Sequence, residues 1–242
     1  MSGIRSFDGV RIAYQELGVG RPVVLVHGFM GNGSQWITGG HAAALAAAGF
    51  RVIMPDLRGH GGSERHCDYP PDVLADDLLA LVAELGLDDY DLGGYSLGGR
   101  VTLRALVRGA RPRRAIIAGQ GITGGGAGNR RALAAIARGG ELDEEARQFA
   151  GWLSQLDADP QAMLHVLDAQ VPTSVDEARR IEVPTLVVVG DRDERRASAA
   201  DLAAALPSSQ YLLVPGDHWT AFTSPELSTA VLDWSSKPFD AR

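Results

Sequence analysis

The stretch GGYSLGGR at residues 93–100 contains a Gly-x-Ser-x-Gly motif centred on Ser96. An apolar strand pattern precedes the motif and an Ala- and Leu-rich helical pattern follows it, so Ser96 is expected on a sharp strand-to-helix turn. Gly94 and Gly98 stand where a Cβ atom would clash with neighbouring backbone in such a turn. An ordinary Gly/Ser turn can produce the same five letters. The flanking elements favour the other interpretation, in which Ser96 is an exposed nucleophile beside a helix N-terminus that stabilises negative charge.

Strand and helix patterns alternate on both sides of this motif. Apolar runs rich in β-branched residues predict strands at 21–28, 50–56, 90–96, 113–119, 183–191 and 210–218. Amphipathic or Ala-rich patterns predict helices at 72–86, 97–107, 196–206 and 225–235. The alternating apolar and polar residues 10–15 indicate a half-buried antiparallel strand of an N-terminal hairpin. This order predicts an α/β fold with a mostly parallel central sheet, flanking helices and right-handed crossovers.

Residues 124–182 interrupt the alternation, because they contain helical stretches rich in Ala, Arg and Glu but no strand-like apolar run. A loop of this length is uncommon inside a compact domain, so we expect a small helical cap inserted after the sixth strand. The core would then comprise residues 1–123 and 183–242. The glycine-rich residues 124–128 are the best candidate for a hinge.

A serine hydroxyl becomes a nucleophile at neutral pH only when a base takes its proton and a third group orients the base. Asp191 and Asp193 follow one late strand pattern, and His218 ends the next. His218 is therefore expected at the sheet edge where open α/β folds bind ligands. We favour Asp193 as the orienting acid, because Asp191 comes directly after Gly190 and suits the turn itself. The remaining histidines considered are interpreted as surface or packing residues: His41, His60, His66 and His165.

Acyl transfer also requires hydrogen-bond donors for the oxyanion that forms at the attacked carbonyl. The residue after the nucleophile supplies one donor in this arrangement, which is the backbone N–H of Leu97. The loop HGFMGNG at 27–33 follows an early strand and can supply the second, for which Phe29 is preferred and Met30 is the alternative. A glycine-rich loop can also cradle phosphate, but no Gly-Lys-Ser/Thr follows this one.

Composition narrows the remaining possibilities. The 242 residues are 45% hydrophobic and 22% charged, the balance of a soluble globular protein. A net charge of −7 without a basic stripe argues against a nucleic-acid partner. The single Cys67 and the absence of an apolar leader segment at the N-terminus favour a cytoplasmic location. No apolar run reaches the roughly 18 residues of a membrane span, so no membrane partner is expected.

With these motifs in order, the chain resembles the α/β-hydrolase family over nearly its whole length. The stretches VLVHGFMG, PDLRGHGGS, GYSLGG, VVVGDRD and PGDHW match successive motifs of that family. The resemblance implies that the inserted helices form a lid, and that Arg58, His60 and Ser63 belong to a structural turn without a catalytic role. Ser96 departs from epoxide hydrolases and haloalkane dehalogenases, which have aspartate at the elbow. The most similar branches are small carboxylesterases, enol-lactonases, C–C bond hydrolases and cofactor-free haloperoxidase-like members.

These observations predict a serine hydrolase that cleaves a small apolar ester or lactone through an acyl-enzyme on Ser96, without a metal or organic cofactor. The sequence does not indicate an oligomeric state. Large apolar side chains expected to line the substrate pocket are Met30, Trp36, Trp152 and Trp219. Two alternatives remain open at this point: a small-molecule receptor that turns over slowly, and a non-hydrolytic biosynthetic enzyme such as a lyase, perhydrolase or cyclase.

Overall fold

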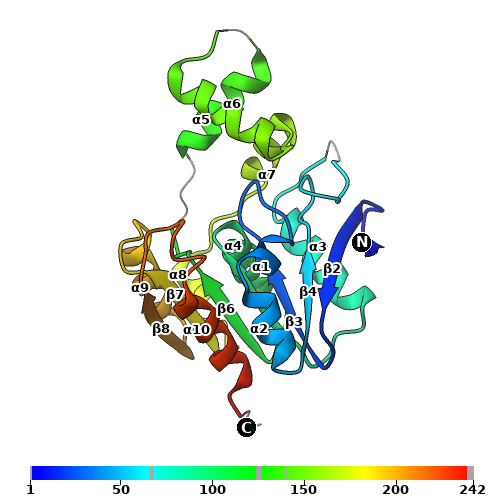
Figure 1. Ribbon diagram of the computed structural model, residues 1–242, viewed down its shortest axis with the longest axis vertical. Helices are drawn as coiled ribbons and strands as arrows, with labels where there is room; N and C mark the ends of the chain where they lie inside the picture. Colours follow the sequence, from blue (N-terminus) through cyan, green and yellow to red (C-terminus); the bar gives the residue numbers. More distant parts are fainter. Residues whose placement is uncertain (1, 66–67, 124–126, 140, 239–242) are drawn as a thin grey trace.

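The computed structural model describes residues 2–65, 68–123, 127–139 and 141–238 (Figure 1). His66, Cys67 and the glycines at 124–126 lie outside the described residues, and with them part of the expected hinge. One eight-stranded sheet forms the centre of the molecule, in the order β1-β2-β4-β3-β5-β6-β7-β8. Its strands are β1 (Ser2–Arg5), β2 (Arg11–Leu17), β3 (Arg21–Val26), β4 (Phe50–Pro55), β5 (Asp91–Tyr95), β6 (Arg114–Ala118), β7 (Thr185–Gly190) and β8 (Ser209–Val214).

The sheet is parallel from β4 to β8, and the hairpin β1–β2 adds an antiparallel edge. This confirms the predicted α/β fold with a mostly parallel sheet. The strand β5 is buried along its whole length, as an apolar run between two layers of helices requires. In register, Val26 pairs with Gly94 and Tyr95 pairs with Ala118, so the carboxyl ends of β3, β5 and β6 meet at one edge.

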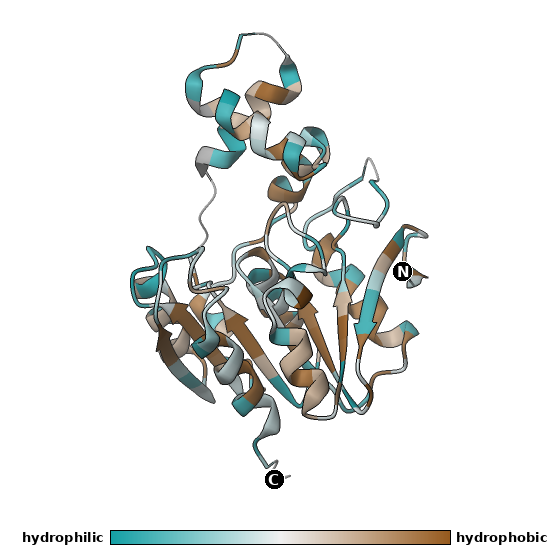
Figure 2. Cartoon of the chain, in the orientation of Figure 1, coloured by the Kyte–Doolittle hydropathy of each residue, from teal (hydrophilic) through white to brown (hydrophobic). Residues whose placement is uncertain are grey.

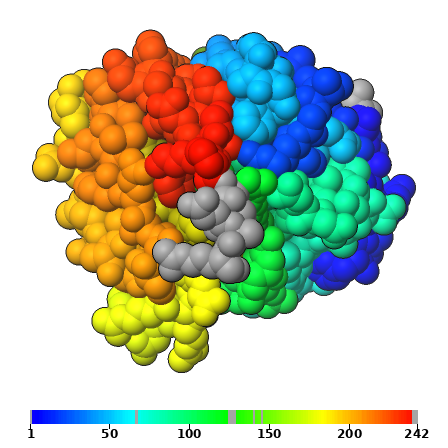
Figure 3. Space-filling model, turned by 90° about the horizontal axis from the view of Figure 1, so that it is seen from below, coloured from blue at the N-terminus to red at the C-terminus, as the bar shows by residue number. Residues whose placement is uncertain are grey.

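Helices cover both faces of the sheet (Figure 1). The core helices are α1 (Gln35–Thr38), α2 (His41–Ala47), α3 (Val73–Glu84), α4 (Leu97–Val107), α9 (Arg196–Ala205) and α10 (Pro225–Ser236). Alternate residues of β3 enter two separate apolar clusters: Val24 belongs to the cluster that includes residues of α3, α4 and α9, whereas Leu25 belongs to the one that includes residues of α2 and α10. Figure 2 shows the resulting brown sheet between helices of mixed polarity. Seen from below, the red helix α10 lies beside the light-blue segment of α2 (Figure 3).

The described part of the chain between β6 and β7 contains helices joined by loops and no strand, as expected. It forms α5 (Ala127–Arg138), α6 (Glu144–Gln155), α7 (Pro160–Asp168) and α8 (Val175–Ala178). Three of these helices start at a side chain that caps a free backbone N–H, namely Asp143, Asp159 and Ser174. Helices α5, α6 and α7 pack on one another above the carboxyl edge of the sheet, whereas α8 packs on α9 (Figure 1). The division of the chain at 124 and 182 stays a prediction.

Within the described ranges, no helix combines the length and apolar character needed to cross a membrane.

Candidate active site

Ser96 occupies the turn between β5 and α4, with φ +56° and ψ −113°. This is strained for a residue with a Cβ, and a backbone hydrogen bond from Ser96 N–H to the Ala118 carbonyl (2.8 Å) helps to hold it. The neighbouring glycines are required sterically. A Cβ on Gly94 would lie 2.3 Å from Gly98, and one on Gly98 would lie 2.1 Å from the Val26 carbonyl oxygen. Close approach of β3, β5 and α4 therefore produces the turn that exposes the Ser96 hydroxyl.

His218 and Asp193 meet Ser96 from two other loops. The Nε2 atom of His218 lies 2.9 Å from Ser96 Oγ, and its Nδ1 atom lies 2.7 Å from Oδ2 of Asp193. The loops after β7 and β8 bring these groups together, because both strands end at the same edge as β5. Tyr95 donates a hydrogen bond to the His218 carbonyl (2.7 Å) and so fixes the position of the histidine backbone. The three residues form one hydrogen-bonded chain that ends at the serine hydroxyl.

Asp193 carries its negative charge in this arrangement. Burial alone would raise the pKa of the Asp193 carboxyl, but hydrogen bonds from His218 and from the Arg195 backbone N–H, with the charges of both residues, bring the pKa below its ordinary value. Asp191 points elsewhere and accepts a hydrogen bond from the Gly216 backbone N–H (2.9 Å). The structure thus places Asp193 against the histidine and Asp191 in the turn, as the sequence argument preferred.

The loop after β3 lies directly against the nucleophile. A Cβ on Gly28 would lie 3.6 Å from the Ser96 Cβ, so the backbone of Phe29 is close to the serine. In the described part of the chain, the N–H groups of Phe29 and Leu97 have no hydrogen-bond acceptor. Met30, with φ +60°, instead donates its N–H to Nε2 of His60 (3.3 Å). Phe29 is therefore better suited than Met30 to donate to a substrate oxygen.

Two buried histidines support this loop from below. His27 accepts a hydrogen bond from the Leu57 N–H at Nε2 (2.9 Å), and its ring packs on that of His60 with centroids 5.0 Å apart. Burial lowers the pKa of His27 to about 4. Burial, together with the proximity of His27, lowers the pKa of His60 to about 3. Both rings are therefore neutral at pH 7, and each can accept a hydrogen bond at Nε2.

Because these pKa values lie below the unfolded value of 6.5, the folded protein binds fewer protons than the unfolded chain between about pH 6.5 and pH 4. The free energy of unfolding should therefore fall on acidification through this window, by about 1.4 kcal/mol per pH unit for each such histidine. Urea denaturation at pH 7.5, 6.5, 5.5 and 4.5 measures this slope. The variant His60→Asn should show a shallower slope than the wild-type protein. An unchanged slope in a folded variant would contradict the lowered pKa of His60.

The turn that contains Arg58 and Ser63 is structural. Asp56 accepts hydrogen bonds from the N–H groups of Gly33 (2.7 Å) and Gly62 (2.8 Å), and so joins this turn to the loop beside Ser96. Arg58 is fully buried and forms ion pairs with Asp77 (2.7 Å) and Asp8 (2.8 Å). Its side chain therefore faces the interior of the core.

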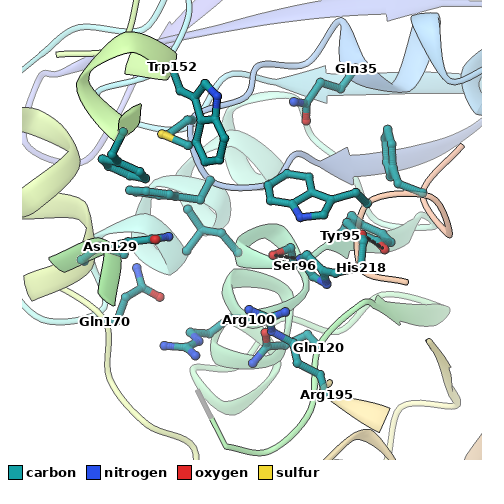
Figure 4. A pocket seen from close by; sticks show the side chains of 18 residues that line it. Gln35, Tyr95, Ser96, Arg100, Gln120, Asn129, Trp152, Gln170, Arg195 and His218 are labelled. Carbon is teal, nitrogen blue, oxygen red and sulfur yellow. Dashed lines mark hydrogen bonds between the residues drawn. The ribbon is translucent and has the colours of Figure 1, made fainter. Parts of the chain in front are cut away.

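A cavity of about 210 Å³ opens above Ser96 and is bordered by both the sheet edge and the cap. Figure 4 shows Ser96 facing His218, with Trp152 and Gln35 on one side and Arg100, Gln120 and Arg195 on the other. Most of the lining is apolar: Phe29, Met30, Tyr95, Leu97, Phe149, Trp152, Leu167, Trp219 and Phe222. Its polar members, besides Ser96 and His218, are Gln35, Arg100, Gln120, Asn129, Gln170 and Arg195. The cavity suits a largely apolar small molecule with a few polar groups.

The predicted lining residues Met30, Trp152 and Trp219 do border this cavity, and the last two are 54% and 74% exposed. Trp36 does not, and the prediction for it is wrong. Its side chain is fully buried in the core beneath the cavity, where it packs edge-on against His41 and Phe222 at centroid distances of 5.3 Å. The sequence could not tell which side of α1 faces the core.

Sequence reasoning also missed the polar lining, above all Arg100. One signal was available: Arg100 lies four residues after Ser96, which places both residues on the same side of α4. Gln120, Asn129 and Gln170 have no comparable signal, since they reach the cavity from separate segments. Among the described residues, no group of three His, Cys, Asp or Glu side chains could hold a metal ion.

Comparison with known proteins agrees with the fold. The sequence pattern of the alpha/beta hydrolase family matches residues 23–230. A protein of Synechocystis sp., provisionally named a non-heme chloroperoxidase, is 29% identical over 252 residues, 87% of this chain and 90% of the relative. A non-heme chloroperoxidase of Kitasatospora aureofaciens is 43% identical over 102 residues, 42% of this chain but only 36% of the relative. The structure of a thermophilic esterase from Thermogutta terrifontis, solved with malate bound, superposes with a TM-score of 0.79 at 27% identity and covers 99% of both chains.

The chain belongs to the alpha/beta hydrolase family. Members of one fold can differ in substrate and even in reaction, so the finer activity has to be argued from the site.

Proposed function

We propose that this protein is a serine hydrolase that cleaves a small ester or lactone through an acyl-enzyme on Ser96. The observation that carries the proposal is the hydrogen-bonded chain from Ser96 Oγ through His218 to Asp193, with the serine hydroxyl open to an apolar cavity. Nucleophile, base and orienting acid lie within hydrogen-bond reach of one another, which is the geometric requirement for nucleophilic catalysis.

In the proposed reaction, His218 takes the Ser96 proton as Oγ attacks the carbonyl carbon. The N–H groups of Phe29 and Leu97 donate to the oxyanion, where the dipole of α4 adds to the stabilisation. The tetrahedral intermediate collapses when His218 returns the proton to the leaving oxygen. Water then gives a proton to His218 as it attacks the acyl carbon, and the second tetrahedral intermediate breaks its bond to Ser96 Oγ. His218 returns the proton to Oγ, the acid leaves, and Asp193 stabilises each transient imidazolium.

The geometry of the site favours an enzyme over a receptor. A receptor has no need for a strained nucleophile, yet Ser96 keeps φ +56° with its hydroxyl on His218. The names of the relatives point both to ester cleavage and to haloperoxidase chemistry. If a peroxide instead of water took the acyl group, the reaction would still pass through the acyl-enzyme proposed for Ser96.

The test is turnover of p-nitrophenyl esters of increasing acyl length, with intact mass spectrometry after treatment with a fluorophosphonate. We expect one stoichiometric adduct on Ser96, sustained turnover, and a preference for short acyl chains that fit the 210 Å³ cavity. Labelling without sustained turnover would favour a receptor or a non-hydrolytic enzyme. Absence of labelling would refute the proposed role of Ser96 as the nucleophile.

A further inference from the structure

Two arginines border the cavity above Ser96, although the protein as a whole is acidic. The chain has a net charge of −7, but the described residues that border the cavity include Arg100 and Arg195 and no aspartate or glutamate. Figure 4 shows these two arginines together with Gln120 on the same side of Ser96. A neutral ester gains nothing from two guanidinium groups, so this side of the cavity calls for a separate explanation.

Arg100 lies one helical turn beyond the nucleophile, and its backbone N–H donates to the Ser96 carbonyl (3.1 Å). Its side chain is partly buried, and the described residues offer the guanidinium neither a hydrogen-bond acceptor nor a carboxylate partner. Burial and the charge of Arg195 lower the pKa of Arg100. A partly buried cation without a partner is unfavourable for the folded protein, unless a ligand supplies the opposite charge.

Arg195 has partners of its own. Its guanidinium lies 3.2 Å from the Glu194 carboxylate and 3.7 Å from the Asp193 carboxylate. Arg195 is therefore paired, and Arg100 is the guanidinium on this side of the cavity without a carboxylate partner among the described residues. A single guanidinium matches a carboxylate, a monoanion whose two oxygens it can bind, better than a phosphate dianion.

The surroundings of Arg100 also have room for such a group. A second cavity of about 220 Å³ shares Arg100 and Gln120 with the first and continues toward Thr173. The Thr173 hydroxyl is buried in this region and has no hydrogen-bond partner among the described residues. Gln120 and Thr173 border the same cavity and offer further donors to a carboxylate bound at Arg100, which itself lies one helical turn after Ser96.

We propose that the physiological substrate is an ester or lactone whose acyl part bears a carboxylate, and that Arg100 binds this carboxylate. This inference rests on the proposed function, since it assigns the acyl side of the same site. The proposal replaces the expectation of an apolar acyl substrate. The apolar lining of the cavity would surround only the hydrocarbon chain that joins the ester carbonyl to the carboxylate.

The experiment compares matched esters that differ only in charge. Monomethyl succinate, glutarate and adipate are each measured against the corresponding methyl ester amide, with a pH-stat or product analysis as readout. For at least one chain length, kcat/KM should be about 10- to 100-fold higher for the carboxylate than for its amide, the range expected for a charged hydrogen-bonded pair. Arg100→Gln should remove this preference, and Arg100→Lys should restore part of it.

The control variant Arg196→Gln removes the same charge from an exposed site outside the cavity and should keep the preference. Because Arg100 has no partner to lose among the described residues, Arg100→Gln should also fold, with a melting temperature equal to or above that of the wild type.

Turnover of the amides with no preference for the carboxylates would overturn this proposal and leave the proposed serine hydrolase activity intact. Failure of all esters, with no labelling of Ser96, would instead refute the proposed function. Stronger competitive inhibition by inorganic phosphate than by glutarate would assign the site to a phosphoryl group and contradict the carboxylate.

Discussion

Replacement of Ser96 by alanine is expected to lower kcat for an activated ester by about 10⁴- to 10⁶-fold, the range seen when a catalytic serine is removed. The reason is geometric. In the proposed mechanism Oγ of Ser96 bonds the acyl group. It lies 2.9 Å from Nε2 of His218, so without it the histidine can at best direct water at the substrate. Initial rates with an acetate or butyrate ester measure the loss, and a fluorophosphonate should no longer add mass to the protein.

The same variant should fold normally. Alanine keeps the Cβ atom and therefore the strain at φ +56°, and the Ser96 N–H bond to Ala118 does not involve the side chain. The melting temperature should stay within a few degrees of the wild-type value. Ser208→Ala, at an exposed position remote from the cavity, is the matched control and should keep full activity. If Ser96→Ala retained more than about a tenth of wild-type activity, another residue would have to be the nucleophile.

The part of the site that the sequence predicts is the part governed by local backbone geometry. Ser96 follows from its motif because only a glycine-flanked turn brings β3, β5 and α4 within the short distances seen at Gly94 and Gly98. His218 follows from the rule that parallel strands end at one edge. The choice between the two aspartates came from the turn at Gly190, and it agrees with the contact from Asp193 to His218.

What the sequence could not predict depends on which side of an element faces which neighbour. Trp36 has a large apolar side chain of the kind that often lines a substrate pocket. Its helix α1 has only four residues, too few for a periodic pattern that would show which side faces the core, and the indole is in fact buried there. Arg100 has the opposite character, because a charged residue on α4 resembles a surface residue in sequence. That Arg100 borders the cavity is seen only in the structure, where the cap helices and Arg195 line the same cavity.

The second large effect concerns the orienting acid. Asp193→Asn is expected to lower kcat/KM by about 10³- to 10⁴-fold with little effect on the fold. Oδ2 of Asp193 accepts the Nδ1 proton of His218 at 2.7 Å, which leaves Nε2 unprotonated toward Ser96. An asparagine amide placed there donates to Nδ1, so the proton moves to Nε2 and the histidine can no longer take the proton of Ser96. The rate of fluorophosphonate labelling should fall in parallel, since it depends on the same proton transfer.

Asp191→Asn is the matched control, because it removes the same charge two residues away. The Asn side-chain carbonyl can still accept the Gly216 N–H bond that Asp191 Oδ1 accepts at 2.9 Å, so the turn is retained. Its kcat/KM should stay within about tenfold of the wild-type value. A larger loss for Asp191→Asn than for Asp193→Asn would transfer the orienting role to Asp191. Equal and small losses would contradict the role of Asp193, because His218 would then keep its tautomer without a carboxylate at Nδ1.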